Sequence, residues 1–326
     1  MKIIFLVECI DNLTASNLVK SFSNTEHIVD VVSYFDNDQK QCVVVENGNI
    51  RTLLYNKRLY TPSEYDAALL WCWGTAHIGR DYLRIFEEQG VFVVNSAYDT
   101  EVTDSKNKLT AMLKYGGVSI PKTLFFDKGL CFDAYQKKLS LLEPSLGAHP
   151  YVFKPNYGTR GRGIQFVNSI EEINNITAML DSKKVLNDGF ILQEFIGDAG
   201  QAISHYRTLV LGESVFPYVL KITASSPMKV SNIAEGGLAE IVNITPDLTQ
   251  ASLLAAKVSG LKMAGVDLMV KNAESSGSAI VVLEVNDGPG TKTFDQAGCN
   301  ASDAVVDFFI NYVENGMSTA MQQASL

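Results

Sequence analysis

A glycine-rich turn between two apolar stretches is the feature that most constrains this chain. The stretch "YVFKPNYGTRGRGIQFV" covers residues 151–167 and places glycines 158, 161 and 163 beside Arg160 and Arg162. A Walker loop requires Gly-Lys-Ser/Thr before a helix, and a Rossmann fingerprint requires a strand, glycines and then a helix. Here strand-like residues stand on both sides of the turn. The sequence therefore predicts a hairpin with Lys154 in its first strand and a flexible, cationic tip that can cover a phosphate.

The composition indicates a globular protein without an attraction for polyanions. The 326 residues are 46% apolar and 19% charged, with a net charge of −9. A chain of this length can bury a large core and is expected to form more than one domain. No apolar run approaches the roughly 20 residues that span a bilayer. The five scattered cysteines fit a reducing compartment. We therefore expect a cytoplasmic protein that binds neither nucleic acid nor membrane.

The order of the apolar segments predicts an α/β protein. Residues 1–97 alternate strands and helices, which is typical of a mostly parallel sheet. A helix is expected from Thr103 or Asp104, as its N-cap, to the glycines at 116 and 117. Prolines and a glycine between residues 135 and 150 predict a loop. Residues 301–315 are expected to form a helix, followed by a tail with little to hold it in place.

A second predicted hairpin brings two carboxylates together. In "MAGVDLMVKNAESSGSAIVVLEVNDGPG", residues 263–290, two strands flank a polar loop. Symmetric pairing of the strands places Asp267 opposite Glu284, about 5 Å away. Asn286 shares the face of Glu284, because side chains alternate along a strand. Two close carboxylates in an apolar sheet repel each other unless a cation joins them, and oxygen ligands indicate Mg²⁺ or Mn²⁺.

Together these motifs resemble the ATP-grasp superfamily, in particular carboxylate–amine ligases of the RimK and glutathione-synthetase type. The similarity runs from about Asn95 to Phe294, and five motifs follow in the order of the family. The resemblance implies a parallel-sheet domain over residues 1–97, a central lid subdomain over 98–192 and a C-terminal antiparallel-sheet subdomain over 193–326. It also implies ATP and Mg²⁺, or Mn²⁺, as cofactors.

The resemblance assigns roles to individual residues. The implied ATP-binding residues are Lys106, Lys154, Gly158, Gly161, Gly163, Gln193, Glu194, Phe195, Ile196, Lys221 and Asn232. The implied metal ligands are Asp267, Glu284 and Asn286. The implied catalytic residues are Arg160 at the lid tip, Lys154 and Arg207, because a carboxylate that attacks a γ-phosphate needs cations to offset the repulsion between two anions.

The implied activity is the ATP-dependent joining of a carboxylate to an amine through an acyl phosphate, with release of ADP and phosphate. Such a ligase of the acid–amino-acid class acts on a small-molecule, peptide or protein carboxylate and an amine acceptor. The alternative is a non-catalytic or regulatory ATP-binding protein, which is expected to lack a metal carboxylate or the lid lysine. This chain has both kinds of residue. The sequence is compatible with a homo-oligomer and does not predict one.

The sequence departs from the family pattern near the second substrate. His205 stands where related ligases have an acidic residue, and "IAE", residues 233–235, replaces a stretch that is commonly basic. An acidic residue in place of a basic one changes the charge that the acceptor pocket favours, so a pocket for free glutamate is not expected. We expect the acceptor between the first domain and the loop 223–237, with Glu235 either beside a cationic acceptor or facing solvent.

Overall fold

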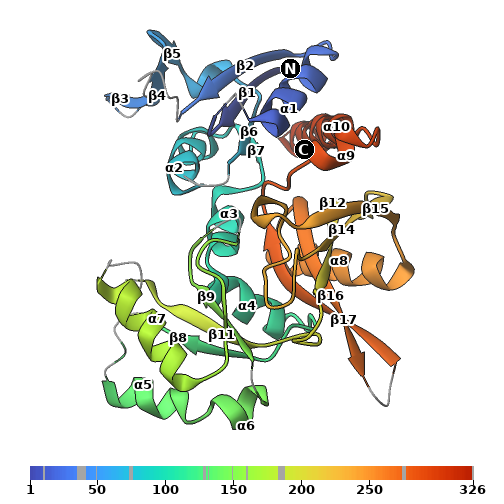
Figure 1. Ribbon diagram of the computed structural model, residues 1–326. Coiled ribbons are helices and arrows are strands. Elements are labelled where there is room, and N and C mark those ends of the chain that lie inside the picture. Colours follow the sequence, from blue (N-terminus) through green and yellow to red (C-terminus); the bar gives the residue numbers. More distant parts are fainter. Residues whose placement is uncertain are drawn as a thin grey trace.

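The computed structural model describes residues 1–9, 12–34, 42–48, 50–72, 76–127, 130, 132–148, 150–158, 161–182, 188–273 and 277–324. Three larger sheets form the frame of the protein, and each has helices packed against it (Figure 1). No helix in these ranges is long and apolar enough to cross a membrane.

The first sheet is parallel, as predicted for residues 1–97, and has the strand order β2-β1-β6-β7. Its strands are β1 (Lys2–Val7), β2 (Ile28–Ser33), β6 (Ala67–Trp71) and β7 (Phe92–Val94). β1 and β6 are almost continuously apolar because helices cover both faces of the sheet. Helices α1 (Leu13–Ser23) and α10 (Ala301–Ala324) pack on one face, and α2 (Ala76–Glu87) packs on the other.

A three-stranded antiparallel meander extends this domain. It consists of β3 (Val43–Asn47), β4 (Ile50–Tyr55) and β5 (Arg58–Tyr60), and the short helix η1 (Pro62–Glu64) follows it. β3 and β4 form a hairpin and pair up to Asn47 opposite Ile50.

The second sheet carries the glycine-rich hairpin and has the order β10-β9-β11-β8. Its strands are β8 (Thr123–Phe126), β9 (Tyr151–Pro155), β10 (Gln165–Val167) and β11 (Phe190–Glu194), and α7 (Ile170–Ser182) packs beside β10. β9 and β10 are antiparallel, with Phe153 opposite Gln165, so the predicted strand–turn–strand pattern is confirmed. The subdomain boundary predicted after residue 192 falls inside β11.

The loop predicted over residues 135–150 is wrong, because α5 (Phe132–Leu139) and α6 (Leu142–Leu146) occupy most of it. Leu139, Leu142 and Leu146 are buried in a core with Phe126 and Phe153, and this packing stabilises the two helices. Pro144 lies in the first turn of α6, where a backbone N–H has no partner within the helix. α6 ends at Gly147.

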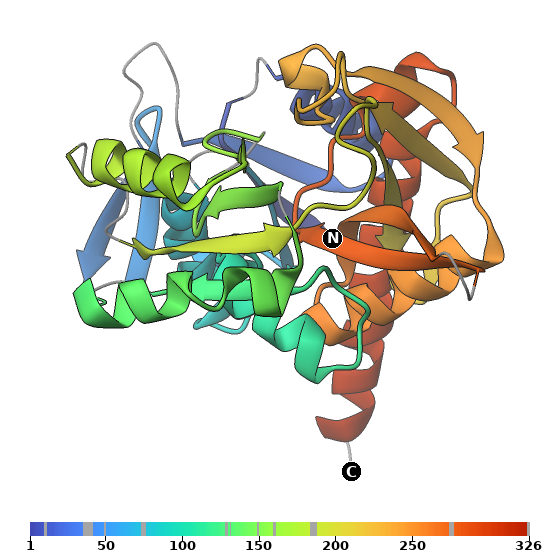
Figure 2. The same ribbon diagram turned by 60° about the horizontal axis from the view of Figure 1, so that its bottom comes forward.

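The third sheet is antiparallel and has the order β15-β14-β12-β16-β17, with β13 paired to β12. Its strands are β12 (Ser204–Leu211), β13 (Ser214–Val215), β14 (Tyr218–Thr223), β15 (Leu238–Asn243), β16 (Met263–Ala273) and β17 (Gly277–Asn286). The remaining elements here are η3 (Ile233–Glu235), α8 (Pro246–Ser259) and α9 (Lys292–Gln296). One face of the sheet packs on α8, and Figure 2 shows the second and third sheets beside each other, in green to yellow and in orange.

The boundaries of two helices differ from the prediction. α3 (Ala97–Asp104) includes the residues expected as N-caps, and Ser105 instead caps α4 (Lys106–Tyr115), because its hydroxyl accepts a hydrogen bond from the Lys108 N–H at 3.3 Å. α10 continues through Ala324 rather than ending near residue 315. Val305, Phe309 and Val313 of α10 are buried against the first sheet, so this face of the helix belongs to the core of the first domain.

Candidate active site

A cavity of about 480 Å³ lies where the second and third sheets meet the carboxyl ends of β1 and β6. Its volume is within the range of about 300–1,000 Å³ that is typical of ligand sites. Most of the residues predicted for the site line its wall. They are Lys106, Lys154, Gly158, Gly161, Gln193, Glu194, Phe195, Ile196, Arg207, Asn232, Asp267, Glu284 and Asn286. The fold thus brings residues from five distant motifs to one cavity.

One end of the cavity is apolar. Ile196, Met269 and Val281 form a small buried cluster with Ile203 and Leu283 beside it. Such a slot between two sheets suits a flat, apolar ring such as a nucleotide base.

Polar residues at this end are tied to the protein by their side chains. The Gln193 amide donates to the Thr123 hydroxyl at 2.9 Å. The Glu194 carboxylate accepts from Lys271 Nζ at 3.0 and 2.9 Å and from the Lys122 N–H at 2.9 Å. The Glu194 side chain is therefore already engaged by three hydrogen bonds. The segment 193–196 thus offers a ligand mainly its backbone and its apolar side chains.

Two lysines lie in the middle of the cavity. Burial lowers the pKa of Lys154 to about 8, with Lys106 adding to the effect and Glu284 opposing it. Lys106 is 9% exposed, and its Nζ donates to the Gly158 carbonyl at 2.9 Å and lies 3.1 Å from Glu284 Oε1. Lys106 thus links the start of the glycine turn to a predicted metal ligand.

The glycine turn lies against the loop that follows β14. Gly161 has a φ of 76°, and a Cβ there would stand 3.3 Å from Val230 Cγ1 and 3.6 Å from Asn232 Nδ2. Glycine thus provides both the left-handed backbone and the close approach of the turn to this loop. Gly163 also has a positive φ, 77°. Arg162 lines the cavity, and Arg160 lies outside the described residues.

A row of three charged side chains crosses three neighbouring strands. Arg207 on β12 pairs with Asp267 on β16, which pairs with Glu284 on β17, as the hairpin analysis predicts. Directly paired residues point to the same face of a sheet, so the three side chains share the face that lines the cavity. From Ala273 opposite Gly277 to Leu268 opposite Val282 the two strands keep one register, and a β-bulge between Leu268 and Asp267 then shifts the register by one residue. This shift brings Glu284 opposite Asp267.

The donor set fits a magnesium site that shares its metal with a ligand. Asp267 and Glu284 supply carboxylate oxygens, and Asn286 supplies the carbonyl oxygen of its amide. The buried Nδ2 of the same amide has no hydrogen-bond partner among the described residues. Those residues hold no group of three or more His, Cys, Asp or Glu side chains suited to a metal. Mg²⁺ commonly takes one or two carboxylates together with phosphate oxygens and water, so a set of two carboxylates and one amide is sufficient.

The structure also places residues at the site whose role the sequence did not indicate. His205 is buried, and its Nδ1 lies 2.8 Å from the Ser231 hydroxyl, which joins β12 to the loop after β14. Burial lowers the pKa of His205, although the Asp267 carboxylate opposes this shift. This contact links residues 26 positions apart, and no local pattern indicates it.

Asp104 and Asp287 line the cavity beyond the predicted metal ligands. Burial raises the pKa of Asp287 to about 7, the Asp104 carboxylate raises it further, and Arg80 opposes the shift. The position of Asp287 directly after Asn286 is the one sequence signal that could have identified it.

Three described residues named from the sequence do not line the cavity, namely Gly163, Lys221 and Glu235. Lys221 pairs with Tyr206 rather than with Arg207, so its side chain points to the opposite face of the sheet, where Nζ donates to Glu240 Oε1 at 2.6 Å. Its predicted contact with the nucleotide therefore has no geometric support. Ile233 and Ala234 line the cavity, whereas Glu235 is exposed and lies outside the set of lining residues. This placement favours the solvent-facing alternative for Glu235.

Comparison with known proteins relates the chain to one family. The RimK-like ATP-grasp domain matches residues 103–309. A protein of Alkalilimnicola ehrlichii named probable alpha-L-glutamate ligase is 32% identical over 219 residues, which cover 67% of each chain. The VanG D-Ala:D-Ser ligase of Enterococcus faecalis has a similar structure, with a TM-score of 0.71 and 18% identity over 96% of this chain and 99% of that one. The ATP-grasp ligase PsnB, solved with a precursor variant, Mg and ADP, gives a TM-score of 0.62 and 18% identity over 94% and 97% of the chains.

Proposed function

Because the chain belongs to the RimK-like ATP-grasp family and is an ATP-dependent carboxylate–amine ligase, we propose that the cavity described above is its active site and that the reaction passes through an acyl phosphate. The membership confirms the resemblance and the ligase activity predicted from the sequence. The observation that carries the proposal is the row of Arg207, Asp267 and Glu284 beside Lys106 and Lys154 in one cavity.

In this proposal the base of ATP occupies the apolar end, near Ile196 and Met269. Lys106 and Lys154 hold the phosphates, and the glycine turn covers them. Asp267, Glu284 and Asn286 would hold Mg²⁺, which supplies positive charge to the β- and γ-phosphates. PsnB, a structural neighbour, was solved with Mg and ADP, which agrees with this choice of cofactors.

The proposed chemistry has two steps. An oxygen of the substrate carboxylate attacks the γ-phosphorus, and the bond from phosphorus to the bridging oxygen of ADP breaks. The acceptor ammonium loses one proton to solvent, and the free amine nitrogen then attacks the acyl carbon. The bond from this carbon to the phosphate oxygen breaks, phosphate leaves, and the second proton that the amide does not keep also passes to solvent. The acyl phosphate is sensitive to water, so the glycine turn must close before the second step. Arg207 and Lys154 provide cations on the wall where negative charge collects.

We propose a small-molecule, peptide or protein carboxylate as one substrate and an amine as the other. The names of the relatives make L-glutamate the first compound to test as either substrate. PsnB was solved with a precursor peptide, so short peptides belong in the same screen.

A screen for ADP release with pooled carboxylates and amines tests the proposal. We expect ADP release that requires Mg²⁺, a carboxylate and an amine together, and a product whose mass equals the two substrates minus water. ADP release that continues at the same rate without any amine, and leaves no amide, would contradict the proposed function.

A further inference from the structure

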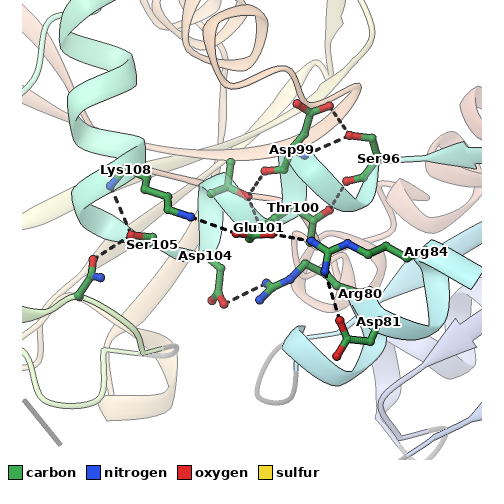
Figure 3. Close-up of polar contacts among 12 residues, drawn as sticks. Arg80, Asp81, Arg84, Ser96, Asp99, Thr100, Glu101, Asp104, Ser105 and Lys108 are labelled. Carbon is green, nitrogen blue, oxygen red and sulfur yellow. Dashed lines mark hydrogen bonds and ion pairs between the residues drawn. The ribbon is translucent and has the colours of Figure 1, made fainter. Parts of the chain in front are cut away.

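The end of the cavity beyond the predicted metal ligands is acidic. Asp287 directly follows Asn286, Asp104 is the last residue of α3, and both line the cavity. Arg80 of α2 reaches across and donates from Nη1 to Asp104 Oδ2 at 3.0 Å, as Figure 3 shows. Arg80 is only 7% exposed. We call these three residues the acidic pole, since one guanidinium there faces two carboxylates.

Among the residues that the structure describes, the neighbours of the acidic pole leave this imbalance in place. Cys72 and Thr103 are buried and uncharged in their ordinary states, and burial raises the pKa of the Cys72 thiol further. Asn12 and Thr14 add neutral polar groups. Lys292 also lines the cavity, but its side chain is exposed to solvent. Toward the nucleotide end, Asp267 is already paired with Arg207, and Glu284 with Lys106.

A partly buried carboxylate that lacks a cation raises the free energy of the folded protein. The ligase reaction consumes an amine, and amines are largely protonated at neutral pH. Resting on the function proposed above, we propose that Asp104 and Asp287 bind the ammonium group of the amine acceptor and disfavour an acceptor with a side-chain carboxylate. Entry of an ammonium group would balance the charge of the acidic pole, whereas a second carboxylate would meet like charges.

The position of the acidic pole suits an acceptor. Asp287 is the next residue after a predicted metal ligand, so an ammonium group beside it would lie close to the place where the acyl phosphate forms. A carboxylate donor would be repelled from the same place by both aspartates.

A neighbouring ion-pair network provides a matched control. Glu101 lies one turn before Asp104 on α3 and pairs with Arg84 and with Lys108, as Figure 3 also shows. Its side chain is 40% exposed and does not line the cavity. Glu101→Gln therefore removes a similar charge, from the same helix and from a similar pair with an arginine of α2, without changing the acidic pole.

Binding of three probes to the full chain, with Mg²⁺ and a non-hydrolysable ATP analogue, tests the proposal. The probes are L-lysine, L-alanine and L-glutamate, and calorimetry or the shift in melting temperature reports their affinity. We expect L-lysine and L-alanine to bind roughly tenfold more tightly than L-glutamate. Asp104→Asn should reduce this preference to near unity, and Glu101→Gln should keep it. If Asp104→Asn unfolds the protein because Arg80 loses its partner, the double variant R80Q/D104N removes both charges together.

Tighter binding of L-glutamate than of L-alanine, an unchanged preference in Asp104→Asn, or no binding of any probe would overturn the proposal. These outcomes are distinct from failure of the ligase function. If L-glutamate is the best acceptor in the ADP-release screen, the acidic pole is misassigned and the ligase function stands. If no pair of substrates releases ADP but L-lysine and L-alanine still bind preferentially, the ligase function fails instead.

Discussion

The guanidinium of Arg207 holds both carboxylate oxygens of Asp267, at 2.7 Å each, across the β12–β16 pair. Asp267 is only 6% exposed. Burial alone would raise its pKa, but the charge and hydrogen bonds of Arg207 outweigh burial, and the pKa of Asp267 is lowered. Arg207 therefore keeps a predicted metal ligand ionised before any metal binds.

Arg207→Met should destabilise the folded protein, because it leaves the buried Asp267 carboxylate without the cation that pairs with it. We expect the free energy of unfolding to fall by about 3 kcal/mol, the size typical of a broken buried pair. Mg²⁺ should restore more stability to this variant than it adds to the unchanged protein, because Asp267 then lacks a resident cation. Urea titrations with and without MgCl₂ measure both effects. Equal increments from Mg²⁺ in the two proteins would argue against Asp267 as a ligand.

Glu284→Gln should abolish turnover and leave the fold intact. The substitution removes a carboxylate from the proposed metal site, so we expect ADP release to fall by roughly 100-fold or more. The melting temperature without ligand should change little, because the Glu284 side chain is 31% exposed. Glu240→Gln, on the opposite face of the same sheet, serves as the control and should retain activity. Near-normal ADP release from Glu284→Gln would show that the metal assignment is wrong.

Lys154 should make nucleotide binding sensitive to pH. Its pKa is about 8, so the side chain is charged below that pH and loses its proton as the pH rises through it. We expect the affinity for a non-hydrolysable ATP analogue to fall above pH 8, by up to about tenfold per pH unit. Lys154→Met should bind more weakly at pH 7 and lose this dependence, whereas Lys114→Ala, at an exposed position, should behave as the unchanged protein. An identical pH profile for Lys154→Met would remove Lys154 from the phosphate site.

The glycine turn should be protected by nucleotide. Three glycines in six residues allow it to move, and its two arginines supply cations that can bind the phosphates of a nucleotide. Trypsin should cleave after Arg160 or Arg162 in the free protein and more slowly with Mg²⁺ and an ATP analogue. Mass spectrometry of the fragments identifies the bond that is cut. Equal cleavage rates in the two states would contradict a lid that closes on the nucleotide.

The sequence predicted the parts of the site that depend on local pattern. The predicted pairing of Asp267 with Glu284 is confirmed, but symmetric strands are not the whole reason for it. Near the turn the strands pair one residue out of the predicted register, and the β-bulge between Leu268 and Asp267 restores the predicted pairing at the site. The predicted position of Lys221 differs from the observed one, because the face of the sheet to which its side chain points depends on the register between β12 and β14. The sequence of two strands joined by a turn does not by itself determine that register.

Contacts between segments that are distant in the sequence could not be predicted. α5 and α6 form because their leucines pack on strands β8 and β9, and a reading of Pro144 and Gly147 alone favours a loop. The contact of His205 with Ser231 and that of Arg80 with Asp104 likewise depend on how whole elements meet. Arg80 carried no signal in the sequence, because an isolated arginine on a helix usually faces solvent.

The packing of α10 on the first sheet has a consequence for the order in which the chain folds during synthesis. Ile3 and Phe5 share a core with Val305 and Phe309, yet some three hundred residues separate the two segments. A ribosome makes β1 well before α10, so one face of the first sheet stays uncovered while the residues between these two elements are synthesised. A premature stop codon before residue 301 would therefore leave one face of the first sheet exposed, although every strand of that sheet had been made.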